Sequence, residues 1–376
     1  MPRKASAGAG AALLVADVCK ALEAIAPLEL AAEWDNVGLL IGDRRQQVRK
    51  LALTIDLTSP VLAEVLAARV QMVMAYHPII FKTLRQLTAQ AAPIAFAAAR
   101  AGLSVYSMHT ALDCATSGAN DVLAGLLGLT QAVPLSPSPL NGSVKVVVFV
   151  PPGGLAKVSG AAFGAGAGRI ENYTECSFHS RGEGTFRGQD GSRPAIGRAG
   201  LLEHVEELRL ELVAPRAKLR EVLSAIREAH SYETPAIDVY PMEQLSVGTG
   251  LGRLGRLDSP LSLAALVRRV KERLHVRRVQ VAGKPAGPIR NVACCAGSCG
   301  ELVQSAIAAG VQAMVTGEVR HHDALAAAEA GMAVICVGHS NSERPALPVL
   351  ARRLRQLLPE LEVSLALADR DPLEIG

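Results

Sequence analysis

Gly338-His339-Ser340-Asn341-Ser342-Glu343, near the C-terminus, is the stretch around which the rest of the chain is organised. A β-branched apolar run at 332–337 precedes it and predicts a buried strand, and apolar residues at helical spacing follow over 344–357. His339 and Glu343 therefore lie at a strand-to-helix turn and share one face if the helix begins early. An imidazole and a carboxylate on one face form half of a metal site, although most such pairs are only solvated.

Two upstream segments place similar side chains just beyond a strand. The apolar run 72–75 leads into Tyr76-His77-Pro78, and the run 105–108 leads into His109-Thr110-Ala111-Leu112-Asp113. Ligands of open α/β sheets collect beyond the carboxyl ends of the strands. We therefore expect these side chains to converge with those of the C-terminal stretch.

Strands and helices alternate along the chain, and this order predicts an α/β fold with a mostly parallel sheet. A chain of 376 residues has room for two or three domains, and its aliphatic composition supplies the core, because only 3% of the residues are aromatic. Pro and Ser gather at 132–142, which is typical of a linker. We predict a first α/β lobe at 1–130, an insert at 131–246 and a second α/β lobe at 247–376.

Several function classes are disfavoured by composition. The net charge is +4 with both signs well mixed, so a dedicated nucleic-acid surface is not expected. The sequence has no run of eighteen apolar residues, so we expect no membrane span. The seven scattered cysteines suit a reducing cytoplasm. The glycines of 163–168 follow a helix, unlike a phosphate loop, and the cysteines of 294–299 have no second pair with which to complete a zinc site.

Five motifs in a fixed order resemble the Nif-three-like family of dinuclear-metal proteins, whose members are named as homologues of GTP cyclohydrolase 1 type 2. The resemblance covers nearly the whole chain. The motifs are Asp35-Asn36-Val37-Gly38-Leu39-Leu40-Ile41-Gly42, Tyr76-His77-Pro78-Ile79-Ile80-Phe81, His109-Thr110-Ala111-Leu112-Asp113, Thr316-Gly317-Glu318 and Gly338-His339-x-x-x-Glu343.

The resemblance implies two related lobes around a metal cleft and a divalent metal cofactor, one or two ions of zinc, iron or manganese per chain. The implied ligands are His77, Asp113, His339 and Glu343, with Glu343 as the bridge. Many members have a second His where this chain has Tyr76. A protonated phenol, with an unperturbed pKa near ~10, is a poor ligand, so the second ion should bind more weakly.

The implied activity is metal-dependent hydrolysis of a purine nucleotide ring. His109 is then the candidate general acid or base, and His322, whose lobe faces the same cleft, is the reserve candidate. Alternatively, His109 only orients Asp113. The turn at 33–38 holds Trp34, which we expect either to pack beneath the turn or, as the resemblance implies, to belong to a turn that borders the metal cleft.

The resemblance also implies a homo-oligomer, for which we expect a hexamer, and a ferredoxin-like insert like the module of trimeric signalling proteins. The second hypothesis for function is a non-catalytic metal-binding scaffold or regulator that acts through protein partners and this insert. The sequence alone does not separate the two hypotheses.

Overall fold

The computed structural model describes residues 13–138, 143–170, 172–242 and 248–373. The chain divides into two compact units, of which unit 1 joins Met1–Ser138 to Gly248–Gly376 and unit 2 is Pro139–Val247. The predicted boundary between 246 and 247 lies outside the described residues. No helix in the described part of the chain is long and apolar enough to cross a bilayer.

The first sheet of unit 1 has five strands, and its three central neighbours run parallel to one another. In spatial order the strands are β1 (Gly38–Ile41), β4 (Ser104–Ser107), β3 (Met72–Ala75), β2 (Lys50–Thr54) and β15 (Glu362–Leu365). Nearly every residue of β2, β3 and β4 is buried, as expected for parallel strands covered on both faces. Strand β1 closes one edge in the antiparallel direction.

The second sheet of unit 1 has six strands. In spatial order they are β11 (Gln280–Ala282), β14 (Ala333–Cys336), β13 (Ala313–Glu318), β12 (Ile289–Ser298), β10 (Gly250–Leu261) and β5 (Leu129–Pro137). The neighbours β12, β13 and β14 are parallel, so their carboxyl ends lie at one edge of the sheet. That edge carries the C-terminal motif of the sequence.

Helices of unit 1 supply the apolar side chains that cover the two sheets, and one buried cluster joins α1, α5, α8 and α12 to both sheets. The helices are α1 (Val15–Ile25), α2 (Ser59–Ala67), α3 (Pro93–Arg100), α4 (His109–Cys114), α5 (Ala119–Leu127), α8 (Leu263–Leu274), α9 (Leu302–Ala308), α10 (His321–Glu329), α11 (His339–Glu343) and α12 (Ala346–Leu357), and a short 3-10 helix spans Leu28–Leu30.

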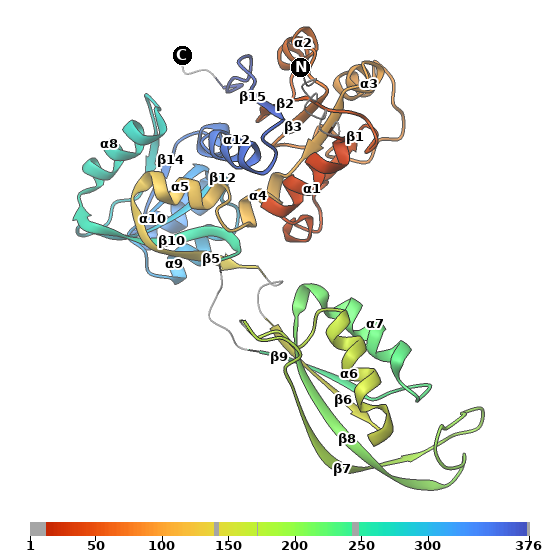
Figure 1. Cartoon of the computed structure of the whole chain (residues 1–376). Coiled ribbons are helices and arrows are strands. Elements are labelled where there is room, and N and C mark those ends of the chain that lie inside the picture. Colours follow the sequence, from red (N-terminus) through yellow and green to blue (C-terminus); the bar gives the residue numbers. More distant parts are fainter. Residues whose placement is uncertain (1–12, 139–142, 171, 243–247, 374–376) are drawn as a thin grey trace, which may run out of the picture. The chain divides into compact units, whose positions relative to one another are not determined.

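The two sheets exchange strands across the chain. Strand β15 comes from the C-terminal segment, yet it pairs in parallel with β2 of the N-terminal segment, as Figure 1 shows. Strand β5, which the sequence analysis placed mostly in the insert, pairs with β10 in the six-stranded sheet. The segments 1–130 and 247–376 therefore do not form separate sheets, because β15 of the second segment completes the sheet of the first.

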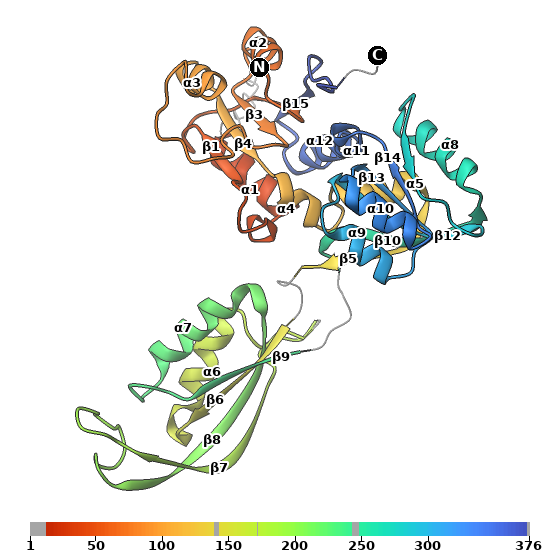
Figure 2. The ribbon, with the colours of Figure 1, turned by 180° about the vertical axis from the view of Figure 1, so that it is seen from behind.

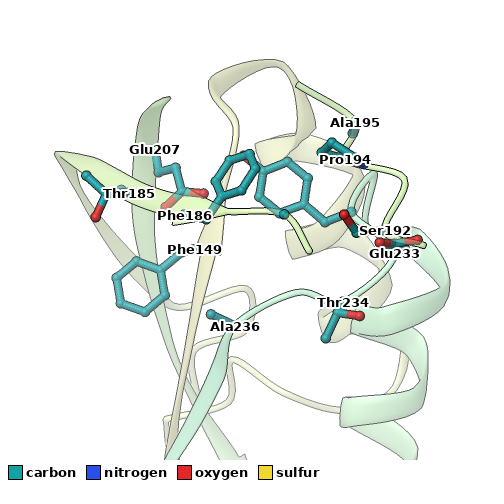
Figure 3. A pocket seen from close by; sticks show the side chains of 13 residues that line it. Phe149, Thr185, Phe186, Ser192, Pro194, Ala195, Glu207, Glu233, Thr234 and Ala236 are labelled. Atoms are coloured by element: carbon teal, nitrogen blue, oxygen red, sulfur yellow. The ribbon is translucent and has the colours of Figure 1, made fainter. Parts of the chain in front are cut away.

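Unit 2 has one antiparallel four-stranded sheet with two helices on one face (Figures 1 and 2). The strand order is β7 (Ser177–Arg187), β8 (Leu202–Pro215), β6 (Ser143–Val150) and β9 (Ile237–Pro241), and the helices are α6 (Leu155–Gly164) and α7 (Leu219–Ala229), with 3-10 turns at Pro152–Gly154 and Arg216–Lys218. Alternate valines and leucines of β6 and β8 pack under the helices. Near Phe149 the unit contains a cavity of about 260 Å³ (Figure 3).

Removal of unit 2 is expected to leave unit 1 folded. The backbone N–H of Ser138 donates to the carbonyl of Thr249 at 3.2 Å, so a Gly/Ser bridge of about four residues can replace 139–247. A shorter protein built this way should give one cooperative thermal transition by circular dichroism. A matched deletion that starts at residue 131 removes most of β5 and leaves β10 paired only with β12, so that variant should be much less stable. Aggregation of the first variant would contradict the prediction.

Candidate functional site

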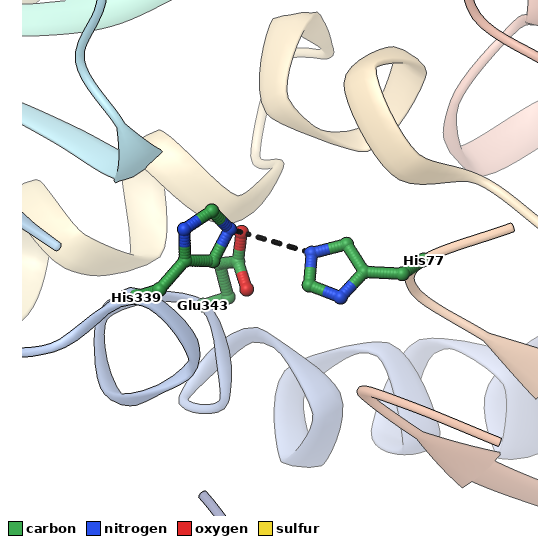
Figure 4. Close-up of side chains that lie close together, drawn as sticks. All are labelled: His77, His339 and Glu343. Carbon is green, nitrogen blue, oxygen red and sulfur yellow. Dashed lines mark hydrogen bonds and ion pairs between the residues drawn. The ribbon is translucent and has the colours of Figure 1, made fainter. Parts of the chain in front are cut away.

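Three side chains from distant parts of the sequence meet in unit 1. His77 follows the end of β3 by two residues, and His339 and Glu343 form the two ends of α11, just beyond β14. Figure 4 shows the two imidazoles and the carboxylate close together, and the three ligand atoms lie within 4.8 Å of one another. We call these three residues the His–His–Glu cluster. They converge because strands from both sheets end at this place.

The Glu343 carboxylate is the centre of the cluster. Its Oε1 lies 3.4 Å from Nε2 of His77 and 3.1 Å from Nε2 of His339. The side chain is only 3% exposed, and its Oε2 has no hydrogen-bond partner among the residues the structure describes. A buried carboxylate whose Oε1 faces two imidazole nitrogens and whose Oε2 has no partner among the described residues fits a divalent ion of the zinc, iron or manganese class.

Each imidazole is oriented by a second carboxylate. The Nδ1 of His77 lies 2.9 Å from Oδ1 of Asp56, and the Nδ1 of His339 lies 3.0 Å from Oε1 of Glu318. A metal-binding histidine commonly donates its other N–H to a carboxylate, which fixes the tautomer that leaves Nε2 free. Sequence reasoning did not assign roles to Asp56 and Glu318, although each lies at the end of a strand, β2 or β13, and that position was the available signal.

Glycines make the room for this arrangement. A Cβ on Gly297, whose φ is +66°, would lie 2.6 Å from Oε1 of Glu343. A Cβ on Gly317 would lie 2.5 Å from the Gly297 carbonyl and 2.9 Å from the Cα of His339. The small-residue turn at 294–300 therefore lets the backbone approach the cluster closely. The neighbouring Cys294 and Cys295 are buried, and burial raises the pKa of the Cys294 thiol to about 12.

Without metal, both imidazoles of the cluster are protonated to the cationic imidazolium form at neutral pH. Burial lowers the pKa of His77, but its hydrogen bonds with Asp56 and Glu343 outweigh burial and raise the pKa to about 10. The hydrogen bond with Glu343 raises the pKa of His339 to about 9 against the effect of burial. Burial raises the pKa of Glu343, yet hydrogen bonds from both histidines bring it below its ordinary value. The metal-free cluster is thus two imidazolium ions around a carboxylate.

Asp113, the fourth predicted ligand, is not in the His–His–Glu cluster. Its Oδ1 accepts a hydrogen bond from the hydroxyl of Tyr76, whose ring is fully buried. Burial and the charge of Asp113 raise the pKa of Tyr76 well above its ordinary value, so the phenol stays protonated and donates. Burial and the charge of Glu343 raise the pKa of Asp113 to about 7. The Tyr76 hydroxyl therefore occupies one oxygen of the predicted ligand.

His109 lies next to the cluster, with its ring centre 5.3 Å from that of His77. Its Nδ1 lies 2.8 Å from Oδ1 of Asp35, so Asp35 is the carboxylate paired with this nitrogen. Burial raises the pKa of Asp35, but hydrogen bonds from His109 and Thr110 hold it below its ordinary value, so the carboxylate is ionised. His109 also has a φ of +31°, a conformation rare outside glycine and typical of functional sites.

His322, the reserve candidate for proton transfer, lies outside the His–His–Glu cluster. It lies exposed in the first turn of α10, and its ring contacts that of His321 with centres 5.5 Å apart. Adjacent positions on a helix diverge by about 100°, so the two histidines face different directions. The structure gives His322 no contact with the three clustered residues among those it describes.

Two exposed aromatic rings border the site. Trp34 is 64% exposed and Phe81 is 51% exposed, and their ring centres are 5.9 Å apart. The Trp34 ring lies 6.0 Å from that of His109. The expectation that Trp34 packs beneath its turn is therefore wrong, and the alternative that it borders the site agrees with the structure. The side-chain amide of Asn36 donates to the Ile80 carbonyl at 2.5 Å, and this hydrogen bond connects the loops that carry Trp34 and Phe81.

The fold and the site together define a class: α/β proteins whose strand ends bring a His–His–Glu group together as a candidate metal site. The chain belongs to the Duf34/NIF3 (NGG1p interacting factor 3) family, whose sequence profile matches residues 13–372. This match confirms the resemblance inferred from the five motifs.

Several relatives carry the name GTP cyclohydrolase 1 type 2 homolog. The Halalkalibacterium halodurans protein is 34% identical over 345 residues, which is 91% of this chain and 92% of that protein. The Mycobacterium tuberculosis protein is 38% identical over 337 residues, or 88% of each chain. Among solved structures, a Bacillus cereus protein related to NIF3 is 32% identical with a TM-score of 0.73, and the match covers 97% of this chain and 99% of that chain.

Proposed function

We propose that the His–His–Glu cluster binds one divalent metal ion and that the protein uses it to hydrolyse the ring of a purine nucleotide. The observation that carries the proposal is the donor set itself. Two imidazole nitrogens face one buried carboxylate oxygen, and each imidazole has a carboxylate on its far nitrogen. The purine substrate is suggested by the name of the relatives.

The residues would divide the work as follows. His77, His339 and Glu343 hold the ion, which when bound would supply Lewis acidity and a nucleophilic water at neutral pH. The hydrogen bond from Tyr76 occupies one oxygen of Asp113 and competes with a second ion for this carboxylate, so we propose that one ion dominates. Asp35 holds the imidazole of His109 so that Nε2 is free to accept or deliver a proton.

The exposed aromatic rings beside the cluster favour binding of a planar substrate. Trp34 and Phe81 present exposed ring surface next to His109, and stacking on such rings is a general way to bind a base. A purine held there would lie beside the residue proposed to exchange its proton.

Assembly and compartment belong to the same proposal. We propose a cytoplasmic homohexamer in which the module in unit 2 is ferredoxin-like. The order β6-α6-β7-β8-α7-β9 and the antiparallel strand order β7-β8-β6-β9 support that fold for the module. The seven free cysteines support a reducing compartment.

The proposed activity is tested by release of formate from GTP. Protein loaded in turn with zinc, iron or manganese is compared with the double variant His339→Ala/Glu343→Ala at equal concentration. We expect formate only from the loaded unaltered protein. If no loaded form exceeds the variant, the purine substrate is wrong, and a metal-binding scaffold becomes the better description of the protein.

Metal affinity is expected to rise with pH. A metal binds neutral imidazole, whereas His77 and His339 have pKa values of about 10 and 9 in the metal-free protein. Binding at pH 7 must therefore release two protons, and the apparent affinity should increase about 100-fold per pH unit between roughly pH 7 and 8.5. Competition with a chromophoric chelator measures this slope. His77→Ala should reduce the slope by about one proton, and an affinity independent of pH would contradict the predicted protonation.

A further inference from the structure

The cavity in unit 2 combines aromatic walls with unpaired negative charge. Phe149 at the end of β6, Phe186 on β7 and Tyr232 after α7 line it, together with the carboxylates of Glu207 and Glu233. No lysine, arginine or histidine is among the described residues that line the cavity. In Figure 3 the two carboxylates lie at opposite ends, with the ring of Phe186 between them.

Both carboxylates of the cavity have defined surroundings in the structure. The carboxylate of Glu207 lies over Gly184, where a Cβ would come within 2.2 Å of its Oε2. The Oε1 of Glu233 accepts a hydrogen bond from the backbone N–H of Arg193 at 2.9 Å. The hydrogen bond from Arg193 thus orients Glu233, and the absence of a side chain at Gly184 leaves room for the carboxylate of Glu207.

The aromatic walls are also held, and by a buried histidine. The backbone N–H of Tyr232 donates to Nδ1 of His230 at 3.0 Å, so Nδ1 carries no proton. The Nε2–H of His230 then donates to the carbonyl of Phe149 at 3.0 Å. His230 therefore joins two walls of the cavity, and its role is structural.

We propose that this cavity binds a small aliphatic diamine or polyamine. Two carboxylates at opposite ends match two ammonium groups, and charge-assisted hydrogen bonds are the strong ones. Aromatic faces attract ammonium groups and cover the methylene chain between them. A volume of about 260 Å³ lies just below the range of drug-sized pockets, so the site suits a short, linear ligand. An anion would be repelled by both carboxylates, and a neutral polar ligand would leave their negative charge uncompensated.

The test uses the full chain and three five-carbon probes in isothermal titration calorimetry: 1,5-diaminopentane, 1,5-pentanediol and glutarate. The three probes have similar length and differ in charge. We expect binding of the diamine only. Equal binding of the diol, or no binding of the diamine, would overturn the proposal.

Matched variants locate the binding. Glu207→Gln removes the charge, and Gly184→Ala keeps the charge but displaces the carboxylate, so each should weaken diamine binding about tenfold or more. Glu206→Gln removes the same charge from the next position of β8, which points to the opposite face and pairs with Arg181. It should leave the affinity unchanged within about twofold. Equal losses in Glu207→Gln and Glu206→Gln would show nonspecific attraction and would also overturn the proposal.

Discussion

Replacing His339 and Glu343 together by alanine is expected to empty the proposed metal site, from about one ion per chain to less than a tenth of that. The double change removes two of the three ligand atoms that lie within 4.8 Å of one another. His77 alone is left, and one imidazole does not retain a divalent ion through purification. Elemental analysis of protein purified without chelators measures the result directly.

A matched control changes the same two residue types away from the site. The double variant His322→Ala/Glu329→Ala changes two exposed side chains of α10, and this variant should keep the full metal content. A loss of metal locates the site only if the variant still folds, because Glu343 is buried and its removal leaves space beside Gly297. Circular dichroism of both variants provides that check. Equal metal in the unaltered protein and in the His339/Glu343 variant would place the metal elsewhere.

Periodicity and strand-end position predicted the general outline of the site from the sequence. The runs 72–75 and 332–337 are both apolar, and a residue that follows such a run in a parallel sheet has to lie at the carboxyl edge. His77, His339 and Glu343 come together for that reason. The same rule covers Asp56 and Glu318, which follow or end strands in the same way.

Partner choice within the site could not be predicted in this way. Whether Asp113 faces the ion or the Tyr76 hydroxyl depends on the distance between two side chains on different elements. Sequence spacing does not contain that distance. The same holds for His109, whose partner Asp35 lies 74 positions away, and for Trp34, whose exposure depends on how the loop of Phe81 approaches it.

The pairing of strands from the two distant segments of unit 1 is the part of the fold that the sequence did not predict. The α/β pattern was visible locally, but β15 and β5 each lie at a sheet edge formed by the other part of unit 1. Long-range pairing of this kind leaves no local signal, because an edge strand such as 362–365 has the same alternation whichever sheet it joins. The predicted boundaries at 130 and 247 therefore followed composition and missed the role of β5.

The other large effect is expected from His109→Ala, which should lower formate release from GTP by ~100- to 10,000-fold, the usual contribution of a general acid or base. The ring of His109 lies beside that of His77, but it is not part of the His–His–Glu cluster, so the metal content should not change. This separation distinguishes a proton-transfer residue from a ligand. Steady-state rates and metal content are measured on the same sample.

Asp35→Asn provides the matched control for the role of the pair. The Asn carbonyl can still accept from Nδ1 of His109, but the charge that stabilises a protonated imidazole is lost. We expect a smaller fall in rate than in His109→Ala, because the Asn side chain still orients the imidazole of His109. If His109→Ala keeps full turnover, proton transfer belongs to another group. If the His109→Ala variant loses the metal, His109 is a ligand, and its ring must move toward the cluster when the ion binds.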